Sequence, residues 1–322
     1  MSARQSHKDN FSSKVAEHYN QVEQKDIKER RKSDIIALRC FNNAMKSLMH
    51  QIAMRTLNIG LGRTGEPLRV LDLGCGKGGD LPKYIRNNQI GLVVGADIAD
   101  VSIEQCKERF KKAVIPHSRR FRGEFFVADL TRDVIRKKIL ALSISDKFNI
   151  ASSQFSIHYS FESFDQAIRY IYNAAENLER LGVFIGTYPD GPKLLKLARN
   201  SETPGIYQVD DVLKVEFPPE SLENPKPFGT KYHFHLKEVV DCPEFLVHPL
   251  VLKKLMTKLG FIQVFDRSFE ETISEERSKH WKAFSQIFEA HKALRFGPGD
   301  ARLDKATWQT ASIYRCFCYR KV

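Results

Sequence analysis

A short apolar run that leads into closely spaced glycines is the part of this sequence best suited to chemistry. The run covers residues 70–73, the glycines fall within residues 74–79, and Asp80 follows them directly. Glycine lets a backbone turn tightly against a ligand, because any Cβ would occupy the space of that ligand. A second apolar run ends about twenty residues later at Asp97, where a carboxylate can accept both hydroxyls of a ribose. Together these features predict that a ligand with a nucleoside binds at the carboxyl ends of neighbouring parallel strands.

The spacing of Gly74, Gly76 and Gly79 also satisfies the fingerprint of dinucleotide-binding proteins, so NAD competes with S-adenosylmethionine as the ligand. Asp72 lies at the end of the first run and Asp80 follows the last glycine, where a pyrophosphate would need helix N–H groups and no carboxylate. Carboxylates at both ends of the loop suit S-adenosylmethionine, whose sulfonium and ammonium groups are positive. The loop therefore favours a methyltransferase over an NAD-dependent dehydrogenase.

The size and charge of the chain indicate a single domain that binds an anionic partner. The chain has 322 residues, 42% of them hydrophobic, which is enough for one large α/β core. Its formal net charge of +12 favours a nucleic acid, because a basic protein gains affinity by releasing the counterions of that acid. One short stretch is especially basic, as expected of a nucleic-acid-binding face. This stretch contains Lys107, Arg109, Lys111, Lys112, Arg119, Arg120 and Arg122.

The six cysteines form no pair or quartet with the spacing of a zinc site, so we expect no metal and a reducing, intracellular compartment. Cys316 and Cys318 alternate along an expected strand and are predicted to pack as small apolar residues. We expect no membrane association, because the sequence shows neither a signal peptide nor an apolar run of membrane-spanning length.

Apolar strands alternate with helical segments over most of the chain, a pattern typical of a doubly wound, mostly parallel α/β sheet. We expect residues 1–10 to be disordered and residues 11–322 to form one domain around a seven-stranded, Rossmann-like sheet. Within it, residues 11–60 are predicted to be N-terminal helices, and residues 204–245 an antiparallel insertion that acts as a lid. The expected strands are 68–73, 91–97, 123–128, 147–153, 181–187, 261–268 and 310–320. The expected helices of the sheet region are 79–88, 101–113, 131–142, 162–178 and 248–259.

A polar and aromatic run follows the fourth strand directly and contains Gln154, His158 and Tyr159. In a doubly wound sheet the ligand lies at the carboxyl ends of the first and fourth strands, where the strand order reverses. Conspicuous polar and aromatic side chains at such a position usually face a ligand. We therefore expect this run to border the reactive end of the cofactor.

Several motifs taken together strongly resemble those of the cellular mRNA cap guanine-N7 methyltransferases. The resemblance spans residue 16 to the C-terminus in the family's order, and the Phe-Asn-Asn-x-x-Lys and Gln-Phe-Ser-x-His-Tyr motifs are its specific part. It implies a class I S-adenosylmethionine-dependent methyltransferase that methylates N7 of the guanine in the RNA cap, GpppN. The motifs are His18-Tyr19-Asn20, residues 38–46, residues 71–80, residues 153–159 and residues 243–247.

The resemblance assigns two groups of ligand-binding residues. Lys46 would pair with the methionine carboxylate, and Asn42 shares its helix face because the two are four residues apart. No catalytic acid or base is expected, since N7 of guanine carries a lone pair and no proton. The implied cofactor-binding residues are Lys46, Asp72, Gly74, Gly76, Asp80, Asp97 at the ribose, Asp129 at the adenine amine, and Gln154. The implied cap-binding residues are Asn42, His158, Tyr159, Glu244 and Tyr314 around the guanosine, with Lys77 and Arg109 at its phosphates.

Two other functions stay open on the residues alone. A different S-adenosylmethionine-dependent methyltransferase, acting on RNA or a small molecule, could use the same sheet without the helix at 33–58 or the insertion. A binding subunit without activity could hold RNA on its basic face, although the intact Lys46, Asp97 and glycine loop argue against this. The resemblance suggests a nuclear protein whose partners are capped RNA, other capping enzymes and RNA polymerase II, and we take a monomer as the default expectation. A viral or parasite origin would place it in the cytoplasm instead.

Overall fold

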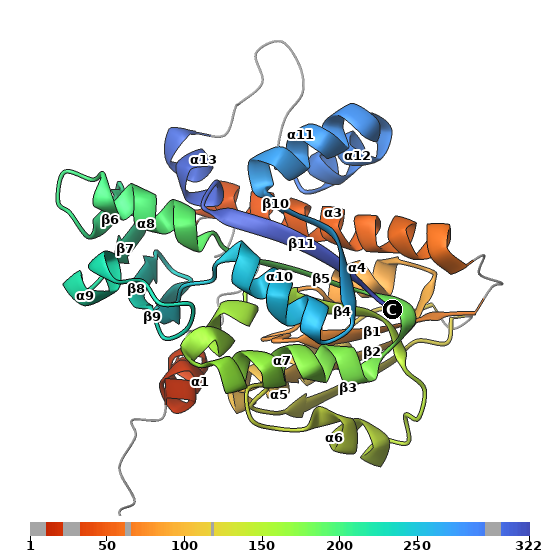
Figure 1. Cartoon of the computed structure of the whole chain (residues 1–322). Helices are drawn as coiled ribbons and strands as arrows, with labels where there is room; N and C mark the ends of the chain where they lie inside the picture. The colour runs from red at the N-terminus through yellow and green to blue at the C-terminus, as the bar shows by residue number, and fades with distance from the viewer. Residues whose placement is uncertain (1–10, 22–32, 62–65, 117–118, 294–303) are drawn as a thin grey trace, which may run out of the picture.

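A seven-stranded sheet forms the centre of the structure, which is a computed structural model (Figure 1). The described residues are 11–21, 33–61, 66–116, 119–293 and 304–322. The strands of this sheet are β1 (Leu68–Leu73), β2 (Ile90–Asp97), β3 (Arg122–Val127), β4 (Phe148–Gln154), β5 (Leu178–Pro189), β10 (Phe261–Ser268) and β11 (Tyr314–Lys321). Their order is β10-β11-β5-β4-β1-β2-β3, with β11 antiparallel to both neighbours and the other pairs parallel. The doubly wound, mostly parallel sheet is confirmed, and the strand order reverses between β1 and β4.

Each face of the sheet has its own hydrophobic core, because successive side chains of a strand point to opposite faces. Val70 of β1 packs in the core that includes helix α3 (Ile36–Leu61). Leu71, its neighbour, packs in the core that includes helix α7 (Phe164–Asn177). Figure 1 shows these two helices on opposite sides of the sheet. Both faces are therefore covered, as a parallel sheet requires.

Helix α3 carries its polar side chains at the edge of the sheet where β1 ends. Its apolar residues, which include Phe41, Met45 and Leu48, recur at helical spacing and are fully buried. The hydroxyl of Ser33 accepts the N–H of Ile35 at 3.4 Å, just before the helix begins. The remaining helices are α1 (Phe11–Gln21), α4 (Leu81–Arg86), α5 (Asp100–Lys111), α6 (Ile135–Ala141), the 3₁₀ helix η1 (Ile157–Glu162), α8 (Gly191–Arg199), α9 (Pro219–Glu223), α10 (Pro249–Lys258), α11 (Phe269–Lys279), α12 (Trp281–Ala290) and α13 (Lys305–Ala311).

A separate antiparallel sheet lies where the sequence predicted an antiparallel insertion. Its strands, in sheet order, are β6 (Ile206–Val209), β7 (Leu213–Glu216), β8 (Lys231–Leu236) and β9 (Val240–Phe245). Tyr232 of β8 is paired with Glu244 of β9, and both side chains are buried. This pairing holds an acidic side chain on the side of the small sheet that faces α3. Movement of the insertion as a lid stays a prediction.

The region between β10 and β11 differs most from the sequence prediction. The helices α11, α12 and α13 were not anticipated, and the strand predicted over 310–320 begins only at Tyr314. Asp304 accepts the N–H of Thr307 at 2.7 Å, so it caps α13 and carries residues 305–311 into a helix. The predicted disorder of residues 1–10 lies outside the described residues. No helix in the described parts of the chain is long and apolar enough to cross a membrane.

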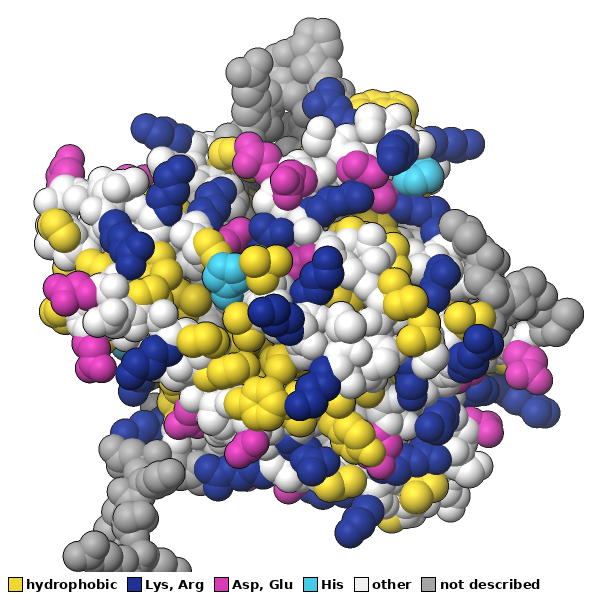
Figure 2. All heavy atoms as spheres, viewed as in Figure 1, with side chains coloured by type: hydrophobic (Ala, Val, Ile, Leu, Met, Phe, Trp, Pro, Cys, Tyr) yellow, Lys and Arg dark blue, Asp and Glu magenta, His cyan; other side chains and the backbone are white. Residues whose placement is uncertain are grey.

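The basic stretch between α5 and β3 is only partly available to a nucleic acid. The guanidinium of Arg119 donates to backbone carbonyls, including that of Ile90 at 2.6 Å. Arg122 donates to the carbonyl of Leu142 at 2.7 Å. These arginines therefore tie loops together, which corrects the reading of the whole stretch as one binding face. Figure 2 shows that Lys and Arg side chains are dispersed over the face drawn there, among acidic and hydrophobic ones.

Candidate active site

The loop after β1 has a backbone that a ligand can approach closely. Gly74 has a φ of +75°, and a Cβ at this position would lie 2.5 Å from the side chain of Ser156. Gly76 has a φ of +49°, and apart from its chain neighbours no described residue lies within 4 Å of where its Cβ would be. Its N–H donates to Oδ2 of Asp97 at 2.8 Å, so the loop is fastened to the end of β2. Glycine is therefore required by both conformation and space at position 74, and by conformation at position 76.

A cavity of about 230 Å³, which we call the strand-end cavity, lies at the carboxyl ends of β1, β2 and β4. Asp97 lines it, with Oδ1 accepting the N–H of Ala99 at 3.0 Å and Oδ2 bonded to the loop. Burial raises the pKa of Asp97, and the amide hydrogen bonds oppose this rise. Helix α1 contributes Phe11 and Val15 to the wall. Other lining residues are Gly74, Gly76, Asp129, Gln154, Phe155, Ser156, Tyr159 and Tyr170.

A second cavity of about 200 Å³, the inner cavity, lies between α3, η1, the small sheet and the start of β11. Its polar groups include Asn42 and His158. Among the described residues, neither ring nitrogen of His158 nor Oδ1 of Asn42 has a hydrogen-bond partner, although these atoms are buried. Buried polar atoms without partners are uncommon, so these atoms are available to a water or a ligand that enters the cavity. The other lining residues include Tyr159, Glu244, Tyr314, Phe234 and Leu236.

The carboxylate of Glu244 is the acidic group of the inner cavity, and its side chain is 4% exposed. Its Oε2 accepts the hydroxyl of Tyr232 at 2.8 Å, and its Oε1 accepts that of Tyr159 at 3.3 Å. Nε2 of His158 lies 3.2 Å from the same Oε1, out of line for a hydrogen bond. The hydroxyl donors compensate the burial of the carboxylate and fix its direction. Glu244 is thus a preorganised acceptor for a ligand with N–H donors.

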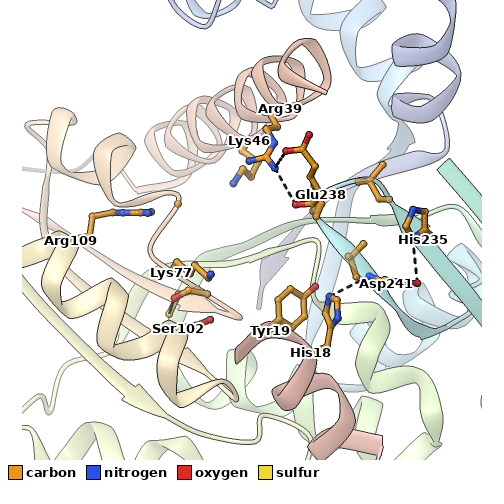
Figure 3. Close-up of a pocket in the computed structure, with 16 residues that line it drawn as sticks. His18, Tyr19, Arg39, Lys46, Lys77, Ser102, Arg109, His235, Glu238 and Asp241 are labelled. Carbon is orange, nitrogen blue, oxygen red and sulfur yellow. Dashed lines mark hydrogen bonds and ion pairs between the residues drawn. The ribbon is translucent and has the colours of Figure 1, made fainter. Parts of the chain in front are cut away.

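A larger and more open space of about 580 Å³, the outer groove, adjoins both cavities (Figure 3). Figure 3 shows Lys46, Lys77 and Arg109 reaching it from α3, the glycine loop and α5 respectively. On its other side, Glu238 accepts a hydrogen bond from Arg39 through its backbone carbonyl at 3.2 Å. Three cationic side chains from separate elements at one opening favour an anion such as a phosphate chain.

Tyr19 of α1 lines all three spaces and separates them. Its hydroxyl lies 2.9 Å from that of Tyr159, and the two rings meet edge to face. The side chain of Asn20 bonds the start of α5 twice, by donating to Asp100 at 2.7 Å and by accepting the N–H of Val101 at 3.2 Å. Helix α1 is therefore pinned over the junction of the cavities.

Phe155 forms the other part of the partition between the strand-end and inner cavities. It follows β4 directly and has a φ of +56°, a conformation that costs energy for a bulky residue. Its N–H donates to the carbonyl of Thr187 at 3.1 Å and to the Thr187 hydroxyl at 3.0 Å, which hold the strained turn. Its ring meets that of Tyr314 edge to face at 4.9 Å. The strain is stored where the two cavities meet.

The sequence model of one protein family, the mRNA (guanine-N(7))-methyltransferase domain, matches residues 2–322. The chain belongs to this family. The mRNA cap guanine-N(7) methyltransferase of Drosophila melanogaster is 35% identical to it, over 95% of this chain and 76% of that protein. The mRNA cap guanine-N(7) methyltransferase 1 of Arabidopsis thaliana is also 35% identical, over 97% of this chain and 82% of that protein.

Solved structures agree on the fold of this family member. A S-adenosylmethionine-dependent methyltransferase from Clostridium acetobutylicum aligns with 96% of this chain and 98% of its own length, at a TM-score of 0.50 and 11% identity. At that identity the likeness shows the fold alone. Within the described residues, no three His, Cys, Asp or Glu side chains come together as metal ligands.

Most residues that the family resemblance implies as ligands line one of the three spaces, with Asp72 and Asp80 as exceptions. Asp72 is 4% exposed within β1, and burial and the charge of Asp80 raise its pKa to about 8. Asp80 is bonded by Lys46 at 3.1 Å and by Lys83 at 2.7 Å. The expected pair of free carboxylates at the loop is therefore absent from the cavities. Asp97 and Asp129 are the carboxylates that line the strand-end cavity.

Tyr19 and Phe155 are site residues to which the sequence analysis gave no role, although both lie in motifs that carry the resemblance. Phe11, Val15 and Tyr19 recur every four residues, so they lie on one face of a helix. This spacing was a usable signal that α1 turns one face to the site. The conformation of Phe155 left no such signal, because nothing in a residue type alone predicts a positive φ for phenylalanine.

Proposed function

We propose that this chain methylates N7 of the guanine in the 5′ cap of mRNA, GpppN, with S-adenosylmethionine as the methyl donor. The products are m7GpppN and S-adenosylhomocysteine. The observation that carries the proposal is the inner cavity. There the buried carboxylate of Glu244 lies beside the strand-end cavity, which the glycine loop borders. Membership of the cap methyltransferase family supports the same reaction.

The deciding experiment is transfer of an isotopically labelled methyl group from S-adenosylmethionine to RNA. One substrate carries a guanosine cap, and the matched substrate has the same sequence with a 5′ triphosphate. We expect label on the capped RNA alone, released by digestion as 7-methylguanosine. Equal labelling of the two RNAs, or label on another atom of the cap, would contradict the proposal.

The strand-end cavity fits the adenosine part of the donor. The carboxylate of Asp97 accepts hydrogen bonds from the backbone N–H groups of Gly76 and Ala99 and can still accept others from the ribose hydroxyls. Asp129, held by the N–H and hydroxyl of Thr131, is proposed to accept the adenine amine. Gln154 is proposed to border the methionine part. That part would pass Gly76, which lines both the strand-end cavity and the outer groove, so that its carboxylate reaches Lys46.

The inner cavity fits the guanine base of the cap. Glu244 is proposed to accept the N1–H and the exocyclic amine, which are two donors on one edge of the base. Asn42 and His158 supply the buried polar atoms that lack partners within the described chain. Tyr159 and Tyr314 provide aromatic walls, and a ring that becomes cationic on methylation is attracted to such walls. The proposed site for the cap phosphates is the outer groove, at Lys77 and Arg109.

The chain's part in the reaction is to orient two ligands. S-adenosylmethionine, when bound, supplies a methyl group on a positive sulfur; the sulfur–methyl bond breaks as the N7–methyl bond forms. No proton leaves N7, so no side chain has to remove one. Tyr19, Phe155 and Tyr159 line both cavities, so they set how the guanine and the methyl group meet. Such positioning is worth several kcal/mol of the barrier, roughly 7–11 in favourable cases.

The chemical step is expected to show no rate dependence on a general base near neutral pH. His158 is the histidine beside Glu244, and it is expected to shape the guanine site without exchanging a proton during transfer. Single-turnover rates with both substrates saturating should therefore form a plateau across roughly pH 5 to 8, the range in which a histidine base would titrate. A bell-shaped profile that disappears in His158→Ala would make His158 an acid–base residue and contradict this mechanism.

Removal of the ring of Tyr19 is expected to weaken the binding of both substrates. Tyr19→Ala should raise the KM for S-adenosylmethionine and for capped RNA by roughly 10-fold each or more, because Tyr19 is half-buried and covering an aromatic side chain with a ligand contributes about 1.5–3 kcal/mol. Tyr19→Phe keeps the ring, loses only the contact with the Tyr159 hydroxyl, and should stay within a few-fold. Tyr172→Ala, at an exposed tyrosine of α7, is the control. A loss confined to one substrate would mean that Tyr19 does not separate the two sites.

We further propose that residues 11–322 act as one methyltransferase domain and that the small antiparallel sheet moves as a lid over the cap. Glu244 on β9 supports this, because opening that sheet would carry an acceptor of the guanine away from α3.

A monomer in the nucleus is proposed, with other capping enzymes and RNA polymerase II as partners beside capped RNA. Sedimentation of the pure protein tests whether it is a monomer, and imaging of the tagged protein in its own cells tests the location.

A further inference from the structure

Asp80, the residue that follows the glycine loop, is shared by two lysine side chains. The ammonium of Lys46 lies 3.1 Å from its Oδ2, and that of Lys83 lies 2.7 Å from its Oδ1. The side chains of Lys46, Asp80 and Lys83 are 16%, 8% and 9% exposed. This group, which we call the Asp80 cluster, joins α3, the glycine loop and α4, and its side chains are largely shielded from solvent.

The two lysines of the Asp80 cluster have different surroundings. Lys46 lines the outer groove and the inner cavity, whereas Lys83 lines none of the three spaces. Lys83 also donates a hydrogen bond to Oδ1 of Asn43 at 3.0 Å. Lys83 therefore touches no ligand in the proposed function, and its partners are Asp80 and α3.

The charges of the Asp80 cluster leave one positive charge over. Burial alone would raise the pKa of Asp80, but Lys46 and Lys83 together hold that pKa well below its usual value, so Asp80 is a carboxylate. Without Lys83, the same carboxylate would neutralise Lys46 alone, and the ammonium would attract a second carboxylate only weakly. With Lys83 present, the cluster as a whole stays cationic.

We propose that Lys83 is a positioning residue for the donor: it neutralises Asp80 and thereby leaves the charge of Lys46 to the methionine carboxylate of S-adenosylmethionine. The inference rests on the proposed function, in which Lys46 faces that carboxylate. With the ligand bound, two ammonium groups and two carboxylates alternate, so no charge in the cluster is left without an opposite neighbour, which is the costly case for a buried charge. Asp80 then directs Lys46 and is not itself a ligand.

The competing role for Lys83 is purely structural, as a tie between α4 and Asn43 of α3. The two roles differ in what the donor must carry. A charge-balancing lysine affects only donors that have a carboxylate, whereas a tie between helices affects every donor equally. Decarboxylated S-adenosylmethionine, in which hydrogen replaces the carboxylate, separates the roles.

The experiment measures the dissociation constants of S-adenosylmethionine and its decarboxylated form by calorimetry. For Lys83→Met we expect a loss of roughly 10-fold or more for the first ligand, the size of one charge-assisted hydrogen bond, and little change for the second. In Lys83→Met with Asp80→Asn the spare positive charge returns, so affinity for S-adenosylmethionine should recover most of that loss. Lys83→Arg keeps the charge and should bind nearly as the unaltered chain does.

Two results would overturn the inference, and a Lys46→Met variant tells them apart. If Lys46→Met discriminates between the two ligands but Lys83→Met weakens both equally, and the second substitution restores nothing, Lys83 is only a tie and the proposed function stands. If Lys46→Met itself does not discriminate, Lys46 does not face the carboxylate, and that part of the proposed function fails together with the inference. Melting temperatures of each variant show whether the fold is kept.

Discussion

Glu244→Gln is expected to lower kcat/KM for capped RNA by roughly 10- to 100-fold, because each hydrogen bond to a charged acceptor contributes about 1.5–3 kcal/mol. The carboxylate can accept both the N1–H and the amine of guanine, whereas the amide offers one acceptor and one mismatched donor. Because the side chain at position 244 is buried, water cannot replace the lost partner, and the mismatch is costly. Steady-state kinetics with each substrate varied in turn give the measurement.

The protein around Glu244 should tolerate the substitution. The hydroxyls of Tyr232 and Tyr159 can rotate to meet an amide in place of the carboxylate. The dissociation constant of S-adenosylmethionine should change little, because Glu244 lines the inner cavity and not the strand-end cavity. Glu216→Gln, at an exposed position of the same small sheet, is the matched control. If the loss appears in the donor's constants, Glu244 has been assigned to the wrong ligand.

Much of the fold followed from local patterns in the sequence. The alternation of apolar strands with helices reports burial on both faces of a parallel sheet, and it placed β1, β2 and β4 within a few residues. The helices α11 to α13 were missed because their segments lie between two strands that were already assigned. α13 shows the difficulty: only the turn at residues 312–313 separates its residues 305–311 from β11, so helix and strand form one nearly continuous run in the sequence.

The site was predictable to different degrees on its two sides. Glycine spacing and Asp97 pointed to the strand-end cavity by general stereochemistry, and the position of His158 after the fourth strand pointed to the same edge of the sheet. Asn42 and Glu244 came from the family resemblance alone. The charge argument for the donor used Asp72 and Asp80, and the structure removes its basis. Burial and the nearby charge of Asp80 raise the pKa of Asp72, which disfavours its charged form, and Asp80 is compensated by lysines. Ionisation depends on tertiary neighbours, which a sequence does not display.

Asp97→Ala is expected to lower the affinity for S-adenosylmethionine by roughly 10- to 100-fold, since charge-assisted hydrogen bonds of about 1.5–3 kcal/mol to the ribose are lost. The same carboxylate fastens Gly76 at 2.8 Å, so its removal also loosens the loop along which the methionine part is proposed to lie. Asp97→Asn keeps one oxygen for the loop amide and should lose less. Asp133→Ala, at a carboxylate paired with Lys138 away from the cavities, should bind as the unaltered chain does.

The comparison of Asp97→Ala with Asp97→Asn separates the ribose contact from the loop contact. A large loss in both variants would mean that the charge on the ribose side dominates, because the asparagine can still hold the Gly76 amide. A large loss in alanine alone would mean that the order of the loop dominates. NADH serves as the ligand of the rejected alternative: its binding to the unaltered chain as tightly as S-adenosylmethionine, with both variants unchanged for the latter, would refute the assignment of the strand-end cavity to the methyl donor.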